Sequence, residues 1–415
     1  MTSGQGLCDI PNLWLDVTRL LSRVGRGALT GIDRVELAYL EAALDGPARY
    51  FCRTTRGFLL LDRVGGQRLF DMVSGGAPLA QADWLSRLTG RGQRPRHRAE
   101  AALRAHAIAR CTKGRLSAFL RRHGAPGITY LNVGHSNLSE ATLSAFAAHP
   151  GTLGVLIHDI IPITHPEYVV EGQPEVFAGR MDRVRRHADL VIGNSAATLD
   201  DLRTHWAGRD MPTRLIAAHL GVTPRSVPQN VHRDPGHFVM LGTVEARKNH
   251  ALMIETWDIL AAQLEDAEMP KLHIIGAVGW KVEKMMAHLR AHPLLDRHIF
   301  LHGPLPDTAV AEHLTRANAL LFPSIAEGYG YPPLEAAQAG ATPICSDLSV
   351  FRETLGDCAV YVDSPGAYPW SETIKQHFRG TAVKPELTML KVPTWAEHFD
   401  TVAEAIQPTS RKGRP

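Results

Sequence analysis

The stretch Phe322–Ala341, FPSIAEGYGYPPLEAAQAGA, joins an apolar strand to a helix through a turn rich in glycine and proline. The apolar run that ends at Phe322 predicts a buried strand. Pro332 marks the start of a helix, because proline is tolerated in the first helical turn, where its missing N–H has no partner. Gly328 and Gly330 allow the backbone to approach a ligand closely, and the start of a helix favours an anion. The stretch therefore predicts a strand-turn-helix unit that holds a phosphate group by its backbone.

Two carboxylates flank this turn, Glu327 and Glu335, with seven residues between them. Carboxylates repel phosphate, so we expect both to contact neutral hydroxyl groups, as on a ribose or a sugar ring. The simpler alternative is a strand-turn-helix unit in which the two acids only decorate the start of a helix.

The segment EGYGYPPLEA resembles the E-x7-E element of the retaining GT-B glycosyltransferases of family 4, which is usually close to EGFGLPPLEA. This copy has Tyr329 and Tyr331 at the two differing positions. The resemblance continues through residues 340–346, 351–353 and 359–363, and it covers most of the C-terminal half; the N-terminal half matches in short islands. It implies an α/β protein of the GT-B fold, with two Rossmann-like domains facing each other across a cleft, and a hexosyltransferase activity.

Composition sets broad limits on the class of protein. The chain has 415 residues, of which 44% are apolar and 21% charged, as in soluble proteins of two or three domains. A net charge of +3 is too small to argue for nucleic acid as a partner. Five scattered cysteines without a C-x-x-C pair argue against a disulfide framework or a zinc site and fit a reducing compartment. With no evident signal peptide and no apolar run of about 20 residues, we expect a cytoplasmic protein.

The beginning of the chain supplies one candidate site residue. Leu13–Val17 is an expected strand, and an apolar rhythm of helical period follows Gly31. The segment Thr30–Arg34 resembles the Gly-Gly-Ile-x-Arg element with which family 4 enzymes begin their first helix, which makes Gly31 a candidate donor-binding residue. For the side chains of Thr30 and Asp33, helix capping is an equally good explanation.

Two segments of the N-terminal half carry weaker signals. Residues 50–83 mix short apolar runs with glycine pairs, and we expect irregular strands and loops there. Residues 87–122 contain 11 Lys or Arg and one acid, Glu100, and we expect helix from Ala99 to Ala109 and again from Leu116 to Leu120. This basic face is most simply a solvated helical surface. The alternative is peripheral contact with the cytoplasmic face of the inner membrane, or guidance of a charged lipid-linked acceptor.

From residue 128 onward, short apolar strands alternate with helices. Polar side chains follow three of these strands, and ligands gather at the carboxyl ends of parallel strands. They are His135, His158, Asp159 and Ser195. The pattern HDxxP that begins at His158 resembles a segment of mannosyltransferase-like members, in which this histidine lies beside the reacting sugar. We therefore expect His158 to be catalytic and the other three residues to bind the acceptor.

The second half repeats the α/β pattern. A strand at Phe238–Leu241 runs into GTVEARKN, which resembles the family loop G-T-x-E-x-R-K-N. The resemblance places Arg247 and Lys248 over the donor diphosphate and Thr243 nearby. Basic residues at a helix start oppose the helix dipole, so a bound anion gives a physical reason for them. A later strand runs into Gly276 and GxxGW, which matches a family segment beside the nucleotide.

These patterns predict the domain organisation. We expect an acceptor-binding domain at 1–225, a linker within 221–235, a nucleotide-sugar domain at 236–385, a C-terminal segment at 386–407 whose helix crosses back to the first domain, and a disordered tail at 408–415.

The resemblance implies how such an enzyme works. Arg247, Lys248 and the backbone amides of Gly328, Tyr329 and Gly330 would stabilise the leaving diphosphate, with no cofactor and, since there is no Asp-x-Asp motif, no catalytic metal. Glu335 would bind the ribose and Glu327 a hydroxyl of the transferred sugar. The partners are a nucleotide-diphosphate sugar, best matched by GDP-mannose, and a glycan or lipid-linked acceptor in O-antigen, capsule or exopolysaccharide synthesis. A UDP- or dTDP-sugar donor, or a non-enzymatic binding scaffold of the same fold, are the alternatives.

Overall fold

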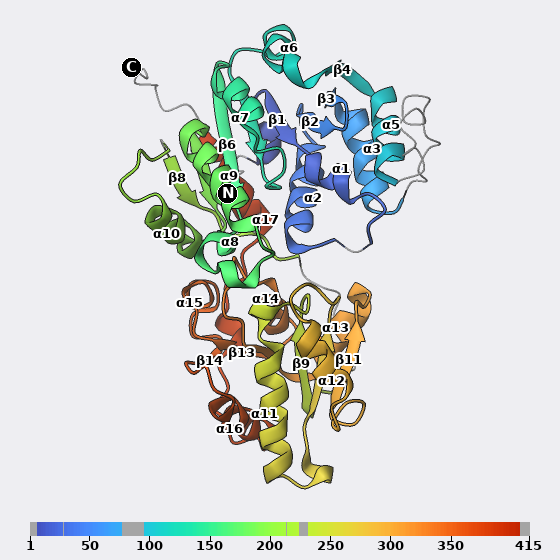
Figure 1. Cartoon of the computed structure of the whole chain (residues 1–415), viewed down its shortest axis with the longest axis vertical. Helices are drawn as coiled ribbons and strands as arrows, with labels where there is room; N and C mark the ends of the chain where they lie inside the picture. The colour runs from blue at the N-terminus through green and yellow to red at the C-terminus, as the bar shows by residue number, and fades with distance from the viewer. Residues whose placement is uncertain (1–5, 28, 77–94, 213, 224–230, 407–415) are drawn as a thin grey trace.

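The computed structural model describes residues 6–27, 29–76, 95–212, 214–223 and 231–406. Within these ranges the strands form two sheets, of 8 and 6 strands, one in each half of the chain. Figure 1 shows the two halves stacked along the long axis of the molecule, with helices packed against both sheets.

The first sheet has the order β4-β3-β2-β1-β5-β6-β7-β8. Six neighbouring strands, β2, β1, β5, β6, β7 and β8, run parallel to one another, whereas β3 is antiparallel to both β2 and β4. The strands are β1 (Leu13–Asp16), β2 (Arg49–Thr54), β3 (Gly57–Leu61), β4 (Ala107–Cys111), β5 (Ile128–Asn132), β6 (Gly151–Ile157), β7 (Leu190–Gly193) and β8 (Arg214–Ala217).

The second sheet is parallel throughout and has the order β11-β10-β9-β12-β13-β14. Its strands are β9 (Asp234–Leu241), β10 (Lys271–Ile275), β11 (Ile299–Gly303), β12 (Ala317–Phe322), β13 (Thr342–Ser346) and β14 (Val360–Val362). The strand order reverses beside β9 and β12, so the loops after these two central strands can meet at one place.

The helices of the first half are α1 (Thr18–Arg23), α2 (Gly31–Ala43), α3 (Arg63–Val73), α5 (Pro95–Ala105), α6 (Leu116–His123), α7 (Glu140–Ala147), α8 (Ile161–Thr164), α9 (Gln173–His187) and α10 (Ala196–His205). Those of the second half are α11 (His250–Gln263), α12 (Glu283–Arg290), α13 (Asp307–Arg316), α14 (Tyr331–Gln338), α15 (Ser349–Leu355), α16 (Ala367–Phe378) and α17 (Trp395–Ile406). Short 3-10 turns add η1 (Leu7–Asp9), η2 (Lys113–Arg115), η3 (Pro166–Tyr168), η4 (Ala246–Lys248), η5 (Asp266–Glu268) and η6 (Leu387–Met389).

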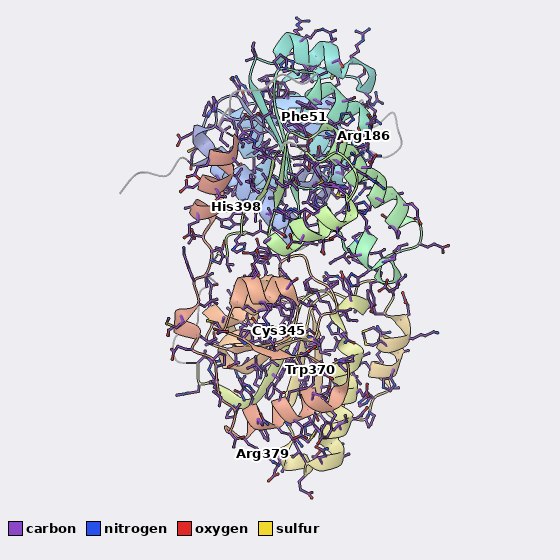
Figure 2. The ribbon with its side chains drawn as sticks, turned by 90° about the vertical axis from the view of Figure 1, so that its left-hand side faces the viewer. Phe51, Arg186, Cys345, Trp370, Arg379 and His398 are labelled. Atoms are coloured by element: carbon purple, nitrogen blue, oxygen red, sulfur yellow. The ribbon has the colours of Figure 1, made fainter. Side chains whose placement is uncertain are left out.

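Each half has its own apolar interior, because a parallel sheet covered on both faces buries its strands completely. Every residue of β12 is buried, as its unbroken apolar sequence predicts. Phe51 lies in the first half, and Cys345 and Trp370 lie in the second, well separated from it (Figure 2). The predicted α/β architecture of two sheet domains is confirmed.

Two local predictions are wrong. Residues 63–73 form helix α3 instead of the irregular structure expected for residues 50–83. Asp62 caps this helix by accepting a hydrogen bond from the N–H of Gly65 at 3.1 Å, and the helix can pack closely because a Cβ at Gly66 would lie 2.4 Å from the Tyr50 ring. Residues 107–109, which were expected to end a helix, instead begin strand β4, because the exposed edge of β3 offers hydrogen bonds that outweigh local helix propensity.

The chain passes from the first sheet to the second between Ala217 and Asp234. Residues 224–230 lie outside the described ranges, as does the tail 408–415, so the expected boundaries and the expected disorder of the tail stay predictions. Helix α17, red in Figure 1, lies among the elements of the first half. Its His398 bonds Tyr39 of α2, with 2.7 Å between the imidazole Nε2 and the phenol oxygen.

Candidate functional site

The loop after β9 carries two basic residues and is tied to the loop after β12. Arg247 and Lys248 lie in the turn η4, which ends at Asn249 with a left-handed backbone (φ 56°). The carbonyl of Arg247 accepts a hydrogen bond from the N–H of Ile325 at 2.8 Å. Its guanidinium also donates to the carbonyl of Ala326 at 2.9 Å. The two loops that the sequence singles out are therefore joined through both backbone and side chain.

Glu327 lies between the two cations. Its Oε1 is 3.0 Å from Arg247 Nη1 and also forms an ion pair with Lys248 Nζ. The three side chains are 21%, 10% and 7% exposed for Arg247, Lys248 and Glu327, so these contacts are largely shielded from water. Arg247 further donates to Glu245 at 3.1 Å. We refer to Arg247, Lys248 and Glu327 as the cation–carboxylate cluster.

Electrostatics keep the carboxylate of this cluster ionised. Burial would raise the pKa of Glu327, but Arg247 and Lys248 outweigh burial and lower that pKa to about 2. Burial lowers the pKa of the Lys248 ammonium, and Glu327 opposes that change. Two cations, Arg247 and Lys248, thus face two carboxylates, Glu327 and Glu245, and their N–H groups are charge-assisted donors of the kind that an anionic ligand accepts.

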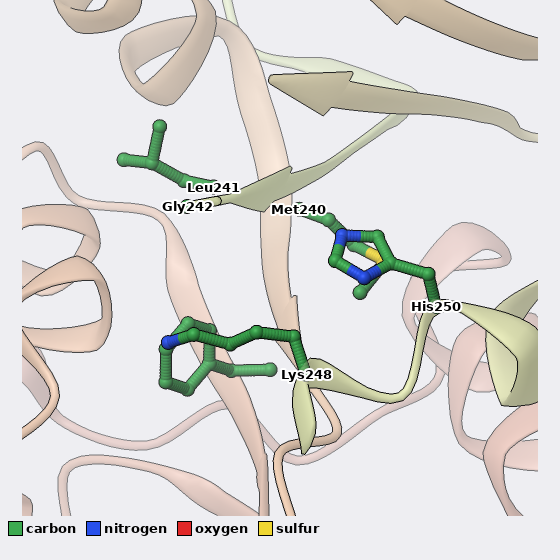
Figure 3. Close-up of a pocket in the computed structure, with 6 residues that line it drawn as sticks. Met240, Leu241, Gly242, Lys248 and His250 are labelled. Carbon is green, nitrogen blue, oxygen red and sulfur yellow. The ribbon is translucent and has the colours of Figure 1, made fainter. Parts of the chain in front are cut away.

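A small pocket borders Lys248. It is lined by Met240, Leu241, Gly242, Lys248, His250 and Phe322. Figure 3 shows the Lys248 side chain extended across this pocket from the loop that precedes α11. The ammonium lies 4.3 Å from the centre of the Phe322 ring. The pocket lies at the carboxyl ends of the two central strands, β9 and β12.

The loops after β9 and β10 also lie against each other. Val244 and Ala277 bond through their backbones at 2.8 Å. A Cβ at Gly276 would lie 1.9 Å from the carbonyl of Gly242, and one at Gly279 would lie 2.9 Å from Thr243. The predicted donor-binding residues Thr243 and Gly276 thus lie beside the cluster's loop, and backbone packing already requires glycine at 276.

In the first half, His135 and His158 meet at the ends of β5 and β6. The His158 N–H donates to His135 Nε2 at 3.1 Å, and the two rings are 4.9 Å apart. His158 Nε2 is 2.7 Å from the carbonyl of Val133. A carbonyl can only accept, so His158 carries its proton on Nε2, and Nδ1 of the neutral ring is an acceptor. Burial lowers the pKa of His158 to about 4, so the ring is neutral at pH 7.

The His158–Asp159 turn contacts the glycine turn of the second half. A Cβ on Gly328 would lie 2.4 Å from the His158 carbonyl and 2.9 Å from Asp159 Cβ. Asp159 also accepts a hydrogen bond from the N–H of Ile161 at 3.1 Å, and burial raises the pKa of its carboxyl. The structure therefore places His158, Asp159 and Gly328 in direct proximity at the domain interface, beside Glu327.

Two other residues of the glycine turn have packing roles. Tyr329 is buried, and its hydroxyl donates to the carbonyl of Leu220 at 2.8 Å. Gly330 has a left-handed backbone (φ 86°), and a Cβ there would lie 2.5 Å from the Phe351 ring. The prediction that this turn binds the donor therefore concerns its backbone amides, because the Tyr329 hydroxyl is engaged.

Ser195 is a helix cap. It is fully buried, and its Oγ accepts a hydrogen bond from the N–H of Thr198 at the start of α10. Its neighbour Asn194 donates to the carbonyl of His158 at 2.7 Å, and Thr198 donates to the carbonyl of Gly328 at 3.4 Å. The sequence prediction gave Ser195 a role in acceptor binding, but Asn194 and Thr198 are the residues of this turn that contact the predicted site.

A further residue, Glu353, joins the two halves. Its carboxylate accepts the N–H groups of Ala196 and Ala197 at 2.6 and 2.9 Å, and it lies 2.7 Å from His219. These amides belong to the first turn of α10, where a carboxylate is favoured. Sequence reasoning gave Glu353 no role, although it lies in a segment, 351–353, that carries the family resemblance.

Gly31 and Glu335 are placed on helices that border the interface. Gly31 is the first residue of α2, and a Cβ there would meet nothing within 4 Å. Arg34 of the same helix pairs with Asp307 of the second half at 3.0 Å. Asp33 accepts the N–H of Thr30 at 2.8 Å, as expected for helix capping. Glu335 lies in α14, one turn into the helix that follows the glycine turn.

No helix in the described ranges is long and apolar enough to cross a membrane.

Comparison with known proteins finds a family that the second half of the chain resembles. Residues 224–385 match the family model described as glycosyl transferases group 1. The serotype-specific mannosyltransferase WbdA of Escherichia coli is 32% identical over 224 residues, which are 50% of this chain and 27% of WbdA. The O-antigen chain mannosyltransferase B of Escherichia coli is 27% identical over 216 residues, 50% of this chain and 56% of that protein. The chain thus spans about a quarter of WbdA and about half of the second relative.

The fold extends the similarity to the whole chain. Anabaena Alr3699/HepE, solved in complex with UDP-glucose, superposes with a TM-score of 0.60 at 12% sequence identity, over 95% of this chain and 94% of that one. This likeness identifies the arrangement of two facing sheet domains as the GT-B fold. In residues 224–385, the chain is similar to the family described as glycosyl transferases group 1.

Proposed function

We propose that this chain is a retaining glycosyltransferase that moves a hexose from a nucleotide-diphosphate sugar to a glycan or lipid-linked acceptor in surface polysaccharide synthesis. The observation that carries the proposal is the cation–carboxylate cluster. It places Arg247 and Lys248 at the carboxyl ends of β9 and β12, next to the turn where Gly328 meets His158 and Asp159.

In the proposed reaction, the bond between the anomeric carbon and the diphosphate oxygen breaks and the diphosphate takes the electron pair. Arg247 and Lys248 stabilise the charge that grows on it, because charge-assisted hydrogen bonds in a shielded site are strong. The acceptor oxygen bonds to the same face of the sugar, and its proton passes to the leaving phosphate. Glu327 holds the two cations in place. With a donor bound, it also accepts a hydrogen bond from a hydroxyl group of the transferred sugar.

His158 acts as a positioning group in this proposal. Its ring is neutral at pH 7, and the hydrogen bond to Val133 leaves Nδ1 as an acceptor. Such a ring is a poor general acid, but it can accept a hydrogen bond from a sugar hydroxyl. His135 stabilises the turn that carries His158, because its Nε2 accepts a hydrogen bond from the backbone N–H of His158.

GDP-mannose is the donor that we propose. The support is the likeness of 50% of the chain to proteins named as O-antigen mannosyltransferases, together with the HDxxP and GTxExRKN segments. UDP- and dTDP-sugars are the alternative donors.

A thermal-shift panel with GDP, UDP, dTDP and ADP and their sugar conjugates tests the donor, because a ligand that binds the folded state raises Tm by mass action. We expect GDP and GDP-mannose to raise Tm, with the shift retained in chelator. Transfer of radiolabelled mannose to a mannan oligosaccharide, with the product anomer assigned by NMR, then tests activity and retention. No shift with any nucleotide would favour the non-enzymatic scaffold.

Glu335→Gln sharpens the same experiment. If Glu335 binds the ribose hydroxyls, the neutral amide should weaken GDP binding by about 10-fold, the value of one charge-assisted hydrogen bond. Glu372→Gln, on α16 and away from the cluster, is the matched control. Unchanged GDP affinity in Glu335→Gln would contradict the ribose assignment.

We further propose that the protein works in the cytoplasm and contacts the inner membrane peripherally. Five exposed cations lie on β4, η2 and α6, namely Arg110, Lys113, Arg115, Arg121 and Arg122. Each would add about 1 kcal/mol near an anionic surface. Flotation with vesicles containing phosphatidylglycerol, compared with neutral vesicles, tests this contact. Equal recovery from both, or no loss in Arg121→Ser/Arg122→Ser, would contradict it.

A further inference from the structure

Four histidines from four different elements gather on one face of the second sheet. They are His237 on β9, His273 on β10, His302 on β11 and His313 on α13. The register explains the gathering, because His273 pairs with Val239 and with Phe300, which lie two residues from His237 and His302 respectively. Residues two apart share a face of a sheet. Helix α13 covers this face and adds His313. We refer to the four as the histidine cluster.

The ring nitrogens of this cluster are close together. One ligand atom from each of His237, His273 and His313 lies within 4.8 Å of the other two. His313 Nδ1 is 3.2 Å from His237 Nε2, and His273 Nδ1 is 2.9 Å from His302 Nε2. Two nitrogens bound to one tetrahedral zinc ion are about 3.3 Å apart, given a Zn–N bond of about 2.05 Å. The spacing between His237 and His313 is close to this value, and the ligand atom of His273 lies within 4.8 Å of both.

One nitrogen in this cluster is buried without a hydrogen bond. Nε2 of His273 has no partner among the described residues, although the atom is buried. Its other nitrogen, Nδ1, is bonded to His302. A metal-binding histidine characteristically uses one nitrogen for the ion and the other for an orienting hydrogen bond. A buried polar atom without a partner costs about 1–3 kcal/mol, and a bound cation would remove that cost.

The surroundings keep the rings in the form that binds metal. Burial and the neighbouring histidines lower the pKa of His237 to about 4 and that of His273 to about 2, so both are neutral at pH 7. Neutral imidazole is the metal ligand. Arg316 is the nearby cation, and it pairs with Asp234 at 3.7 Å.

We propose that His237, His273 and His313 bind one divalent transition-metal ion of the zinc class, with His302 orienting His273. Imidazole nitrogens suit Zn²⁺, Ni²⁺ and Cu²⁺ and disfavour Mg²⁺ and Ca²⁺, which prefer oxygen. The argument that five scattered cysteines exclude a zinc site concerns thiolate ligands, and it does not apply to a site built from histidine.

The site has a structural role, separate from the proposed transfer reaction. His237 lies on β9 three residues before Met240, which lines the pocket at Lys248, and at about 3.3 Å per residue this places it about 10 Å from that pocket. The ion would fasten α13 to the neighbouring strands β9 and β10, and the bond between His273 and His302 would link the site to the edge strand β11. Helix α13 begins at Asp307, which pairs with Arg34 of the first half. Metal binding would therefore stiffen one side of the domain interface.

The test uses the full chain without a histidine tag, stripped with EDTA and dialysed against ZnCl₂. We expect one zinc per chain by mass spectrometry, and a Tm that rises with Zn²⁺ but not with Mg²⁺. His273→Gln and His313→Gln should each weaken zinc binding at least 10-fold. His288→Gln, on the exposed surface of α12, is the matched control and should bind zinc as the wild type does.

Cobalt provides a readout that does not depend on the variants. Co²⁺ bound to the wild-type protein should give the visible absorption of a tetrahedral nitrogen site, and Zn²⁺ should abolish it. Zinc binding below one equivalent, equal binding by His313→Gln and the wild type, or an equal loss in His288→Gln would each overturn the proposal. None of these outcomes bears on nucleotide binding.

Discussion

The carboxylate of Glu327 lies 3.0 Å from the guanidinium of Arg247 and also pairs with the ammonium of Lys248. The three residues come from two loops that are 79 residues apart in the sequence. The ion pairs therefore join the GTVEARKN loop to the EGYGYPPLEA segment in one cluster that is shielded from water.

Lys248→Ala should reduce turnover far more than stability. Removing one group that stabilises the leaving diphosphate costs about 100- to 1,000-fold in kcat. The loss of folding free energy should stay near 1–3 kcal/mol, because Arg247 still neutralises Glu327. Steady-state kinetics and urea unfolding measure the two effects, with exposed Lys284→Ala as the control. If turnover fell only in proportion to the unfolded fraction, Lys248 would have no catalytic role.

Gly31→Ala separates packing from ligand binding. A Cβ at Gly31 meets nothing within 4 Å, so the fold itself tolerates alanine there. Replacing a helical glycine should raise the unfolding free energy by about 0.4–1 kcal/mol. If the donor approaches this backbone closely, the added methyl group should raise the KM for the donor by about 10-fold or more, an effect of about 1.4 kcal/mol. A more stable variant with an unchanged KM for the donor would contradict the prediction that Gly31 lies in the donor site.

Gly328→Ala should disturb the contact between the two halves. The new Cβ would lie 2.4 Å from the His158 carbonyl, which is closer than any normal contact, so the domains must shift apart. A displacement of about 1 Å at a reacting centre can cost about 100-fold in rate. Kinetics and small-angle X-ray scattering test this expectation. Gly114→Ala, where a Cβ meets nothing within 4 Å, is the control. Wild-type activity in Gly328→Ala would show that this contact is dispensable.

Acid should destabilise the protein because several histidines are buried in the neutral form. His398 is 1% exposed, and burial lowers its pKa to about 4, whereas an unfolded histidine has a pKa of about 6.5. The unfolded state therefore binds more protons between these values, so the stability is complete above about pH 6.5 and is lost as the pH falls toward 4. The loss reaches about 1.4 kcal/mol per pH unit for each such group.

Urea unfolding between pH 7.5 and 4.5 measures this slope. His158 and His250, whose pKa values burial also lowers to about 4, should add to it. His398→Asn should reduce the slope by about one proton. An identical slope in His398→Asn and the wild type would show that His398 is not the neutral buried group described here. In Figure 2, His398 lies in the upper half, where α17 meets the first domain.

The sequence by itself determined the local units. The unbroken apolar run of β12 is buried on both faces, and the glycines and prolines after it specify a turn and a helix start, because these residues act on their own backbone. The same reasoning located the strand ends that are followed by His135, His158 and Asp159.

Tertiary structure alone decided which side chains meet. The Glu327 ion pairs, the Glu353 contact with α10 and the histidine cluster all depend on sheet order and on the packing of one domain on the other, and no local pattern encodes either. Helix α3 and strand β4 were missed for the same reason. Packing against the Tyr50 ring stabilises α3, and pairing with the edge of β3 stabilises β4, although local propensity favours neither. The chain therefore specifies its elements through short-range backbone chemistry, whereas its site is specified by contacts that form only when distant segments are packed together.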